Sequence, residues 1–319
     1  MYRFLYITIF FLVIALSLKA QENLVPNGSF EEYYNCPGGG IMESKYWYSP
    51  TTGTPDLFHV CANSSNPQLG VPQNGPSGPG GYQYPVSGDA YVGFFSRAND
   101  DAREYLQVEL NKPLEGGKKY SVQFYLNLAD FYAVSVWNIG MHLSNTAISS
   151  PLINTYVLNV TPQILNEEGN FLNWEEWTEV KIDYTAQGGE TFITIGNFYT
   201  EANTDTMLIT GGQYSPSTYI FIDDVSITEI ICEPVFPNVF TPNDDAMNES
   251  WQPKLCLDDD EQADIIVYNR WGQKVYESIN KDAFWDGRTT SGNDVSEGTY
   301  YYIITTKKET YKGTIQLLR

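Results

Sequence analysis

The chain has 319 residues, of which 42% are hydrophobic and 15% aromatic. This apolar content supports packed cores and excludes a wholly disordered or fibrous protein, and the length favours two domains. Acidic residues outnumber basic ones 39 to 18, for a formal net charge of -21. Because Lys and Arg bind phosphate backbones and anionic lipids, this balance argues against nucleic acid or an anionic membrane surface as partner.

The N-terminus has the pattern of a secretion signal. Arg3 precedes an apolar run from Phe4 to Leu18, and Ala20 is followed by polar residues. The run is too short to span a bilayer comfortably, and a small residue at this point suits a signal peptidase. We predict that residues 1–20 are a signal peptide, the alternative being an uncleaved anchor. Gln21 rather than Cys follows the cut, which argues against a lipoprotein, and no later segment is apolar enough to cross a membrane.

Alternation of apolar and polar residues dominates the next two hundred residues, and no convincing amphipathic helix is present. Short strands with one polar face are typical of an antiparallel sandwich. Residues 66–85 are rich in Gly and Pro, and we expect a long loop there. The strands are predicted at Ala90–Phe95, Leu106–Leu110, Tyr120–Leu128, Val134–Leu143, Trp177–Tyr184, Phe192–Phe198 and Tyr219–Ile227.

The four cysteines fall in two close pairs, Cys36 with Cys61 and Cys232 with Cys256. An exported chain reaches an oxidising compartment, where we expect each pair to form a local disulfide. Each bond would close a loop of roughly 25 residues. In the chain-entropy model it would stabilise the folded state by about 3 kcal/mol. The alternative, a zinc site of four thiolates, lacks Cys-x-x-Cys spacing.

A second set of strands begins after Cys232, so we divide the mature chain into domains at 21–232 and 233–319. The second domain has the size of an immunoglobulin-like β-sandwich. A tight turn at residues 269–272 and a polar turn at residues 307–309 separate its hairpin strands. These strands are predicted at Ala263–Tyr268, Lys274–Glu277, Thr299–Thr306 and Tyr311–Leu317.

The second domain carries several short motifs in a fixed order. They are Phe236–Asn243, then Asn269, Arg270, Trp271 and Gly272, then Trp285, Asp286 and Gly287, then Gly298–Tyr302, and a final segment with Lys312, Gly313, Leu318 and Arg319. This series resembles the gliding motility-associated C-terminal domain of Bacteroidetes proteins, the type B sorting domain of the type IX secretion system. The resemblance implies an export signal read by the outer-membrane translocon, and a protein that is secreted or held at the cell surface. Residues 243–249 lack the glycines of the family's metal-type loop, so we expect a solvated turn there.

The first domain resembles galactose-binding-like jelly rolls, the fold of many carbohydrate-binding modules. Leu24–Glu31 and Tyr219–Ile227 resemble their first and last strands, and Ser87–Gly93 resembles an internal element. The resemblance implies a structural Ca²⁺ with candidate ligands Ser29, Glu31, Asp89, Asp223 and Asp224.

A physical argument points to the same acids. Alternation places Asp223 on the face of Phe221, Val225 and Ile227, where a carboxylate is costly unless a metal or several donors satisfy it. The alternatives are a bulge that turns the acid outward and a hydrogen-bonded acid without metal.

Aromatic residues in predicted loops suggest a ligand surface. Flat sugar faces stack on Trp and Tyr, while neighbouring polar residues supply hydrogen bonds; each of these aromatics could instead pack in a core or rim. The candidates are Trp47, Tyr48, Tyr82, Tyr84, Tyr132 and Trp137.

The sequence argues against an enzyme. Its two histidines, His59 and His142, lie outside any nucleophile motif, and the acidic pairs at residues 167–168 and 175–176 are typical of solvated loops. We therefore expect an all-β, non-catalytic surface or secreted protein that binds polysaccharide or a cell-surface glycan. The alternatives are an adhesive protein that contacts other proteins and, third, a surface glycan hydrolase or esterase.

Overall fold

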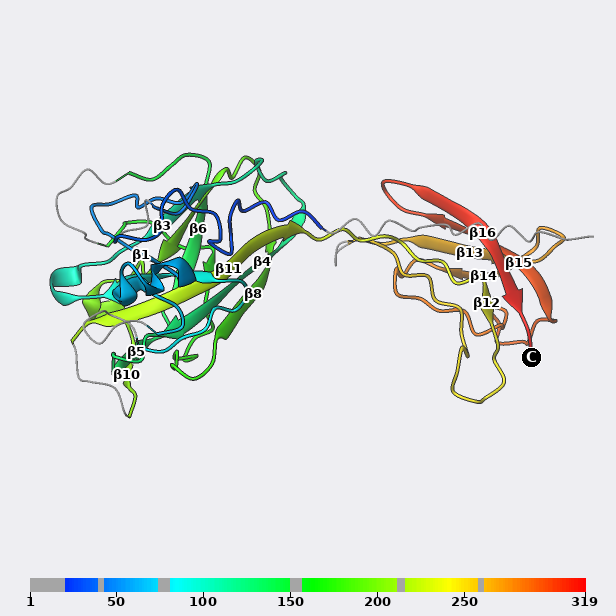
Figure 1. Cartoon of the computed structure of the whole chain (residues 1–319). Coiled ribbons are helices and arrows are strands. Elements are labelled where there is room, and N and C mark those ends of the chain that lie inside the picture. The colour runs from blue at the N-terminus through cyan, green and yellow to red at the C-terminus, as the bar shows by residue number, and fades with distance from the viewer. Residues whose placement is uncertain (1–20, 40–42, 74–80, 150–156, 211–215, 258–260) are drawn as a thin grey trace, which may run out of the picture. The chain divides into compact units, whose positions relative to one another are not determined.

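The computed structural model describes residues 21–39, 43–73, 81–149, 157–210, 216–257 and 261–319 (Figure 1). The predicted signal peptide lies outside this range. The chain divides into two compact units between Ile230 and Ile231. The described part contains the short 3-10 turns η2 (Val60–Asn63), η3 (Pro67–Leu69), η4 (Asn99–Asp101) and η5 (Glu201–Asn203). No helix among these residues is long and apolar enough to cross a membrane.

The N-terminal unit consists of two antiparallel sheets and a separate antiparallel pair of short strands (Figure 1). The larger sheet has the order β1 (Asp56–His59), β2 (Ala90–Arg97), β11 (Thr218–Glu229), β4 (Lys119–Leu128) and β8 (Thr178–Thr185). The second sheet has the order β3 (Leu106–Glu109), β9 (Phe192–Gly196), β6 (Gly140–Ser144) and β7 (Ile164–Leu165). The pair is β10 (Thr206–Leu208) with β5 (Val134–Val136).

The core of this unit lies between the two sheets. Alternate side chains of the larger sheet, such as Ile220, Ile222 and Leu126, join those of the smaller sheet, such as Ile195 and Met141, in one fully buried cluster. Period-two alternation gives β4 and β8 one face for the core, as the sequence predicted, whereas most of β2 and the first half of β11 are buried on both faces. The opposite face of the larger sheet is also buried, and there the rings of Phe58 in β1, Tyr91 in β2 and Phe221 in β11 contact one another.

The predicted strand Val134–Leu143 is wrong as a single strand. It is split into β5 and β6, which belong to different sheets. The break lies at Trp137 and Asn138, where the Ile139 amide donates to the Trp137 carbonyl and the Asn138 side chain accepts the Asp205 amide at 2.9 Å. The alternation of residues 134–143 continues through the break and so does not mark it, and the contact found there comes from a residue 67 positions away.

A bulge in β11 changes which face each acid occupies. The pairing of β11 with β4 shifts between Asp223, opposite Tyr125, and Ser226, opposite Gln123, and Asp224 has a φ of 48°. Ile227 therefore shares the inner face with Val122, whereas Asp223 lies on the outer face with Phe221. The expectation that Asp223 shares a face with Phe221, Val225 and Ile227 is therefore met for Phe221 and wrong for Ile227, and Asp223 is fully buried under the loop before β2.

The C-terminal unit is built on one five-stranded sheet (Figure 1). Its core is closed by irregular segments that carry Trp251 and Trp285, whose backbone amides and carbonyls pair with each other at 2.8 Å. Both indoles are buried and donate to the backbone carbonyls of Pro237 and Arg288. The order of the sheet is β12 (Val239–Phe240), β16 (Thr310–Leu317), β15 (Gly298–Thr305), β13 (Asp264–Tyr268) and β14 (Lys274–Ser278). The predicted all-β class is confirmed in both units.

Candidate functional sites

The turn between β13 and β14 displays an arginine and a tryptophan. The Asn269 side-chain oxygen accepts the amides of Trp271 and Gln273, both at 3.0 Å, and Gly272 supplies the left-handed residue with a φ of 77°. Held in this way, Trp271 is 70% exposed, and the Arg270 guanidinium lies 4.0 Å from the centre of its ring. Asn269 and Gly272 therefore shape the turn, and Arg270 and Trp271 face solvent.

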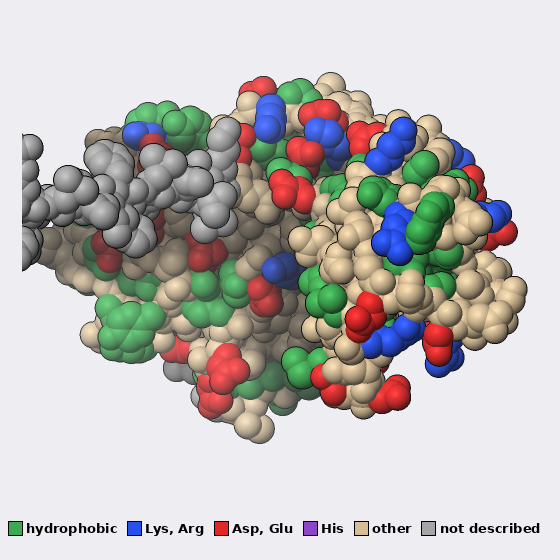
Figure 2. All heavy atoms as spheres, turned by 90° about the vertical axis from the view of Figure 1, so that its right-hand side faces the viewer, with side chains coloured by type: hydrophobic (Ala, Val, Ile, Leu, Met, Phe, Trp, Pro, Cys, Tyr) green, Lys and Arg blue, Asp and Glu red, His purple; other side chains and the backbone are tan. Residues whose placement is uncertain are grey.

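A pocket of about 550 Å³ adjoins this turn. Basic, acidic and uncharged side chains share its lining, among them Lys274 and Glu297. Figure 2 looks onto one end of the C-terminal unit, where Lys and Arg side chains lie among acidic and hydrophobic ones. This end of the C-terminal unit therefore carries charges of both signs, unlike a surface that binds phosphate backbones.

The remaining sorting motifs meet at the end of β16. Arg319 donates to the Val295 carbonyl at 2.6 Å and to the Gly287 carbonyl at 3.2 Å, and its amide donates to Glu297 at 2.6 Å. Asp286 accepts the Arg288 amide and so closes the Trp-Asp-Gly turn.

The last segment is shaped by one glycine. A Cβ at Gly313 would lie 2.4 Å from the Tyr302 hydroxyl on the neighbouring strand, so any larger residue there would have to displace the Tyr302 ring. Its neighbour Lys312 and the penultimate residue Leu318 are both exposed.

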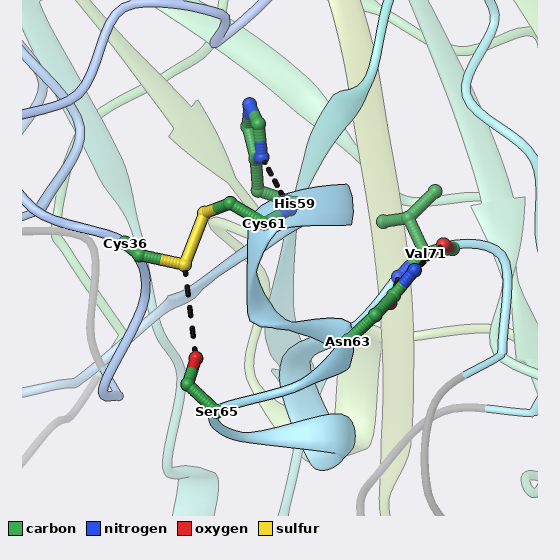
Figure 3. Close-up of a disulfide and its surroundings, with 6 residues drawn as sticks. All are labelled: Cys36, His59, Cys61, Asn63, Ser65 and Val71. Atoms are coloured by element: carbon green, nitrogen blue, oxygen red, sulfur yellow. Dashed lines mark hydrogen bonds between the residues drawn. A yellow bond between two sulfur atoms is a disulfide. The ribbon is translucent and has the colours of Figure 1, made fainter.

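Both predicted disulfides are confirmed, Cys36–Cys61 and Cys232–Cys256. Figure 3 shows the first of them beside η2, where the His59 ring nitrogen Nδ1 accepts the Cys61 amide at 2.9 Å. The next loop is closed by two hydrogen bonds of 2.8 Å between the Asn63 side chain and the Val71 backbone. The disulfide thus ties the first loop of the unit to β1 through a segment that is itself tightly hydrogen-bonded.

Glu31 connects the start of the unit to β2. Its carboxylate accepts the amides of Asp89 at 2.8 Å and Ala90 at 3.0 Å. Gly88 allows this approach, because a Cβ there would lie 2.2 Å from the Glu31 oxygen. Asp89 takes part through its backbone, and its own carboxylate is exposed.

Asp223 and Asp224 are adjacent but occupy different environments. Asp223 is buried, and its two oxygens accept the amides of Val86 at 2.8 Å, Ser87 at 3.4 Å and Asp224 at 2.7 Å. Burial raises the pKa of Asp223 to about 8, and the charge of Asp224 adds to the rise, against the effect of these donors. Asp224 is partly exposed and accepts the Ser87 hydroxyl at 2.8 Å. Three amide donors can therefore satisfy Asp223 without a metal.

Part of the predicted calcium set lines a polar pocket of about 500 Å³. Ser29, Glu31 and Asp224 lie in its wall, whereas Asp89 and Asp223 do not. Within the described ranges no group of three or more His, Cys, Asp or Glu has a metal-binding arrangement. A Ca²⁺ ion in this pocket would be bound by the carboxylates of Glu31 and Asp224. Most of its six to eight oxygen ligands would come from hydroxyls, carbonyls and water.

Three of the six candidate ligand aromatics are buried. Trp47 packs on Phe30 and donates to the Asn27 carbonyl at 2.9 Å; Tyr132 stacks on Tyr219. Trp137 is 9% exposed, at the break between β5 and β6. None of these rings offers a free face to a ligand. Tyr48 is more exposed, but its hydroxyl accepts the Gln107 side chain at 2.9 Å over the outer face of the smaller sheet.

The other two candidates, Tyr82 and Tyr84, come together in one pocket. Their hydroxyls are 3.0 Å apart, their ring centres 5.5 Å apart, and both side chains are more than half exposed. The pocket has a volume of about 420 Å³ and is completed by Gln83, Pro85, Asp130, Trp174, Glu175 and Trp177. Tyr82 and Tyr84 precede β2, Asp130 follows β4, and the two tryptophans precede β8.

Sequence reasoning missed Asp130 and both tryptophans of this pocket. The signal that could have found the tryptophans is their spacing at the start of the predicted strand Trp177–Tyr184, where Trp177 is the first residue and Trp174 lies three residues earlier. Asp130 could not be found from the sequence, because only the fold brings it to Tyr82, 48 positions away.

Both histidines have structural contacts. Nδ1 of His59 accepts the Cys61 amide, and Nδ1 of His142 lies 2.8 Å from the Thr161 carbonyl. These contacts position the rings against the backbone rather than beside a nucleophilic side chain.

The C-terminal motifs all lie in the unit that begins at Ile231. Residues 235–317 match the CHU_C type IX secretion signal domain. This match confirms the sorting domain recognised from the sequence and implies export through the type IX secretion system. No curated protein sequence matches the chain significantly.

Solved structures with a similar course of the chain include carbohydrate-binding and adhesin domains. The CBM22-1 xylan-binding domain of Xyn10C from Paenibacillus barcinonensis is 9% identical, covers 67% of this chain and 99% of its own, and has a TM-score of 0.38. The CBM22-1–CBM22-2 tandem of the same protein is 9% identical over 95% of this chain and 87% of its own, with a TM-score of 0.41. The K2 cleaved adhesin domain of Lys-gingipain, a Porphyromonas gingivalis protein, is 14% identical over 64% and 97%, with a TM-score of 0.32. Likeness at this level says nothing about what this chain binds.

Proposed function

We propose that the protein is exported by the type IX secretion system and acts outside the cell, without catalysis, by binding a glycan through its N-terminal unit. The signal-domain match supports export. The observation that carries glycan binding is the pocket in which the exposed Tyr82 and Tyr84 adjoin Trp174 and Trp177, with Asp130 and Glu175 at its edge. Aromatic faces for sugar C–H groups and carboxylates for hydroxyls are the two kinds of contact that a saccharide needs.

The non-catalytic part of the proposal rests on how the titratable groups are used. Asp130 accepts the Tyr82 amide at 2.7 Å, and both histidines contact the backbone. In these contacts the three side chains are used to position the backbone.

The test is a binding screen of the mature protein against a broad polysaccharide panel. Replacing both tyrosines, as Tyr82→Ala/Tyr84→Ala, should weaken any binding found by about tenfold or more, since two exposed aromatic contacts are lost. The matched control is Tyr34→Ala/Tyr46→Ala, which removes two tyrosines of similar exposure outside the pocket. Equal loss in both variants, or no loss in either, would contradict the assignment of the site.

A second candidate function is contact with another protein. It is favoured by exposed apolar side chains on and beside the β5–β10 pair, namely Phe131, Met207 and Leu208. Absence of binding to every glycan in the screen would favour this candidate.

We further propose that Ca²⁺ stabilises the N-terminal unit at Glu31 and Asp224. Bound there, the ion would link the first segment of the unit to the bulge of β11. Adding Ca²⁺ to the chelated protein should raise the melting temperature of this unit, and Glu31→Gln should remove the increase. An unchanged melting temperature would contradict the proposal.

A further inference from the structure

The two exposed tyrosines of the pocket are perpendicular. Their ring planes are inclined at 87°, with the ring centres 5.5 Å apart. Two rings in this arrangement cannot both lie flat on one planar surface. Two successive sugar rings that are turned relative to each other can contact both tyrosines.

The backbone holds this corner in place. The Tyr82 amide donates to Asp130 at 2.7 Å, and the Gln83 amide donates to the Pro72 carbonyl at 2.8 Å. The Tyr84 carbonyl accepts the Trp177 indole and the Gln83 side chain, both at 2.9 Å. Trp177 in turn meets the buried Tyr91 ring edge-on at 6.0 Å. A ligand would therefore meet a platform that is already ordered, which reduces the entropy lost on binding.

The charge of the pocket has one sign. Among its lining residues Asp130 and Glu175 are acidic, and neither Lys nor Arg is present. Asp130 is partly buried, and this burial raises its pKa. Glu175 is exposed to solvent. The whole chain is also strongly acidic, with a net charge of -21. An anionic sugar would meet repulsion at the pocket and no cation to pair with.

From these three observations we infer that the pocket around Tyr82 and Tyr84 binds single, uncharged glycan chains and rejects both anionic glycans and flat crystalline surfaces. This inference rests on the proposed glycan-binding function and specifies its substrate class. Hydroxyl groups would donate to Asp130 and Glu175, and the two tyrosines would contact neighbouring sugar rings.

The experiment compares soluble xylan, mannan and glucan with the carboxymethylated form of each, using the mature full-length protein at low salt. We expect a neutral polymer to bind and its carboxymethylated form to bind about tenfold or more weakly. Microcrystalline cellulose and crystalline chitin should not retain the protein. Equal affinity for a neutral polymer and its carboxymethylated form, or retention on the crystalline solids, would overturn the inference while glycan binding itself stood. If no polymer bound, the proposed function would fail together with it.

A charge reversal in the pocket gives the second arm. Glu175→Lys should strengthen binding of the carboxymethylated polymer by about threefold or more, since it replaces a repulsive charge with an attractive one. The matched control is Glu176→Lys, the same change at the adjacent exposed residue, which lies outside the pocket lining. An equal gain in both variants would assign the repulsion to the surface as a whole and overturn the role of the pocket.

Discussion

A buried carboxylate links the stability of the N-terminal unit to pH. The pKa of Asp223 is raised to about 8 by burial, from an ordinary value of 3.8. The folded state therefore binds a proton more tightly than the unfolded state. The contribution of Asp223 to stability is fully present below about pH 4 and is lost as pH rises towards 8, at up to about 1.4 kcal/mol per pH unit.

We predict that, with chelator present, the melting temperature of this unit falls as pH rises from 4 to 8. In Asp223→Asn the slope should be smaller, because the group no longer titrates. Asp89→Asn is the control, since the Asp89 carboxylate is exposed and only its amide is used, to Glu31. Identical slopes in Asp223→Asn and the wild type would contradict the prediction.

At the scale of elements, the turn between β13 and β14 separates residues that shape the backbone from residues that face solvent. Gly272 has a φ of 77°, a conformation that strains any other residue. We expect Gly272→Ala to lower the free energy of unfolding of the C-terminal unit by about 1 kcal/mol. Trp271→Ala should change it by less than about 0.5 kcal/mol, because the indole is largely exposed. Denaturant titration of the two variants measures both values, and a larger loss in Trp271→Ala than in Gly272→Ala would contradict this division.

Elements whose signal is local could be predicted from the sequence. The strand later found as β4 shows clear alternation, β11 opens on a run of aromatic and β-branched residues, and both disulfides follow from the close spacing of the cysteines. Features that depend on contacts between distant residues could not be predicted. The bulge at Asp224 shifts the alternation without a marker in the sequence, and the gap between β5 and β6 lies where Asn138 contacts Asp205, 67 positions away.

The candidate ligand site shows the same limit. Aromatic residues in loops could be recognised as a class, but the sequence does not show which of them are exposed to solvent. Tyr82 and Tyr84 lie on the surface, while Trp47 packs in the core. Which aromatic is free depends on the loops that cover each sheet, and these loops carry little periodic signal.

At the scale of the whole molecule, each unit has its own core and its own disulfide. Cys36–Cys61 lies in the unit that ends at Ile230, and Cys232–Cys256 lies in the unit that begins at Ile231. The hydrophobic clusters are likewise confined to one unit or the other. Such a division lets export and ligand binding be separated by truncation.

We predict that a chain truncated after Ile230 folds but stays in the periplasm, because it lacks the residues that match the secretion signal domain. Its melting temperature and its Cys36–Cys61 disulfide should equal those of the N-terminal unit in the full chain, which separates a failure of export from a failure of folding. Residues 231–319 fused to an unrelated periplasmic protein should carry that protein to the cell surface or the medium. Appearance of the truncated chain at the surface, measured by protease accessibility of intact cells, would overturn the assignment of the signal to the C-terminal unit.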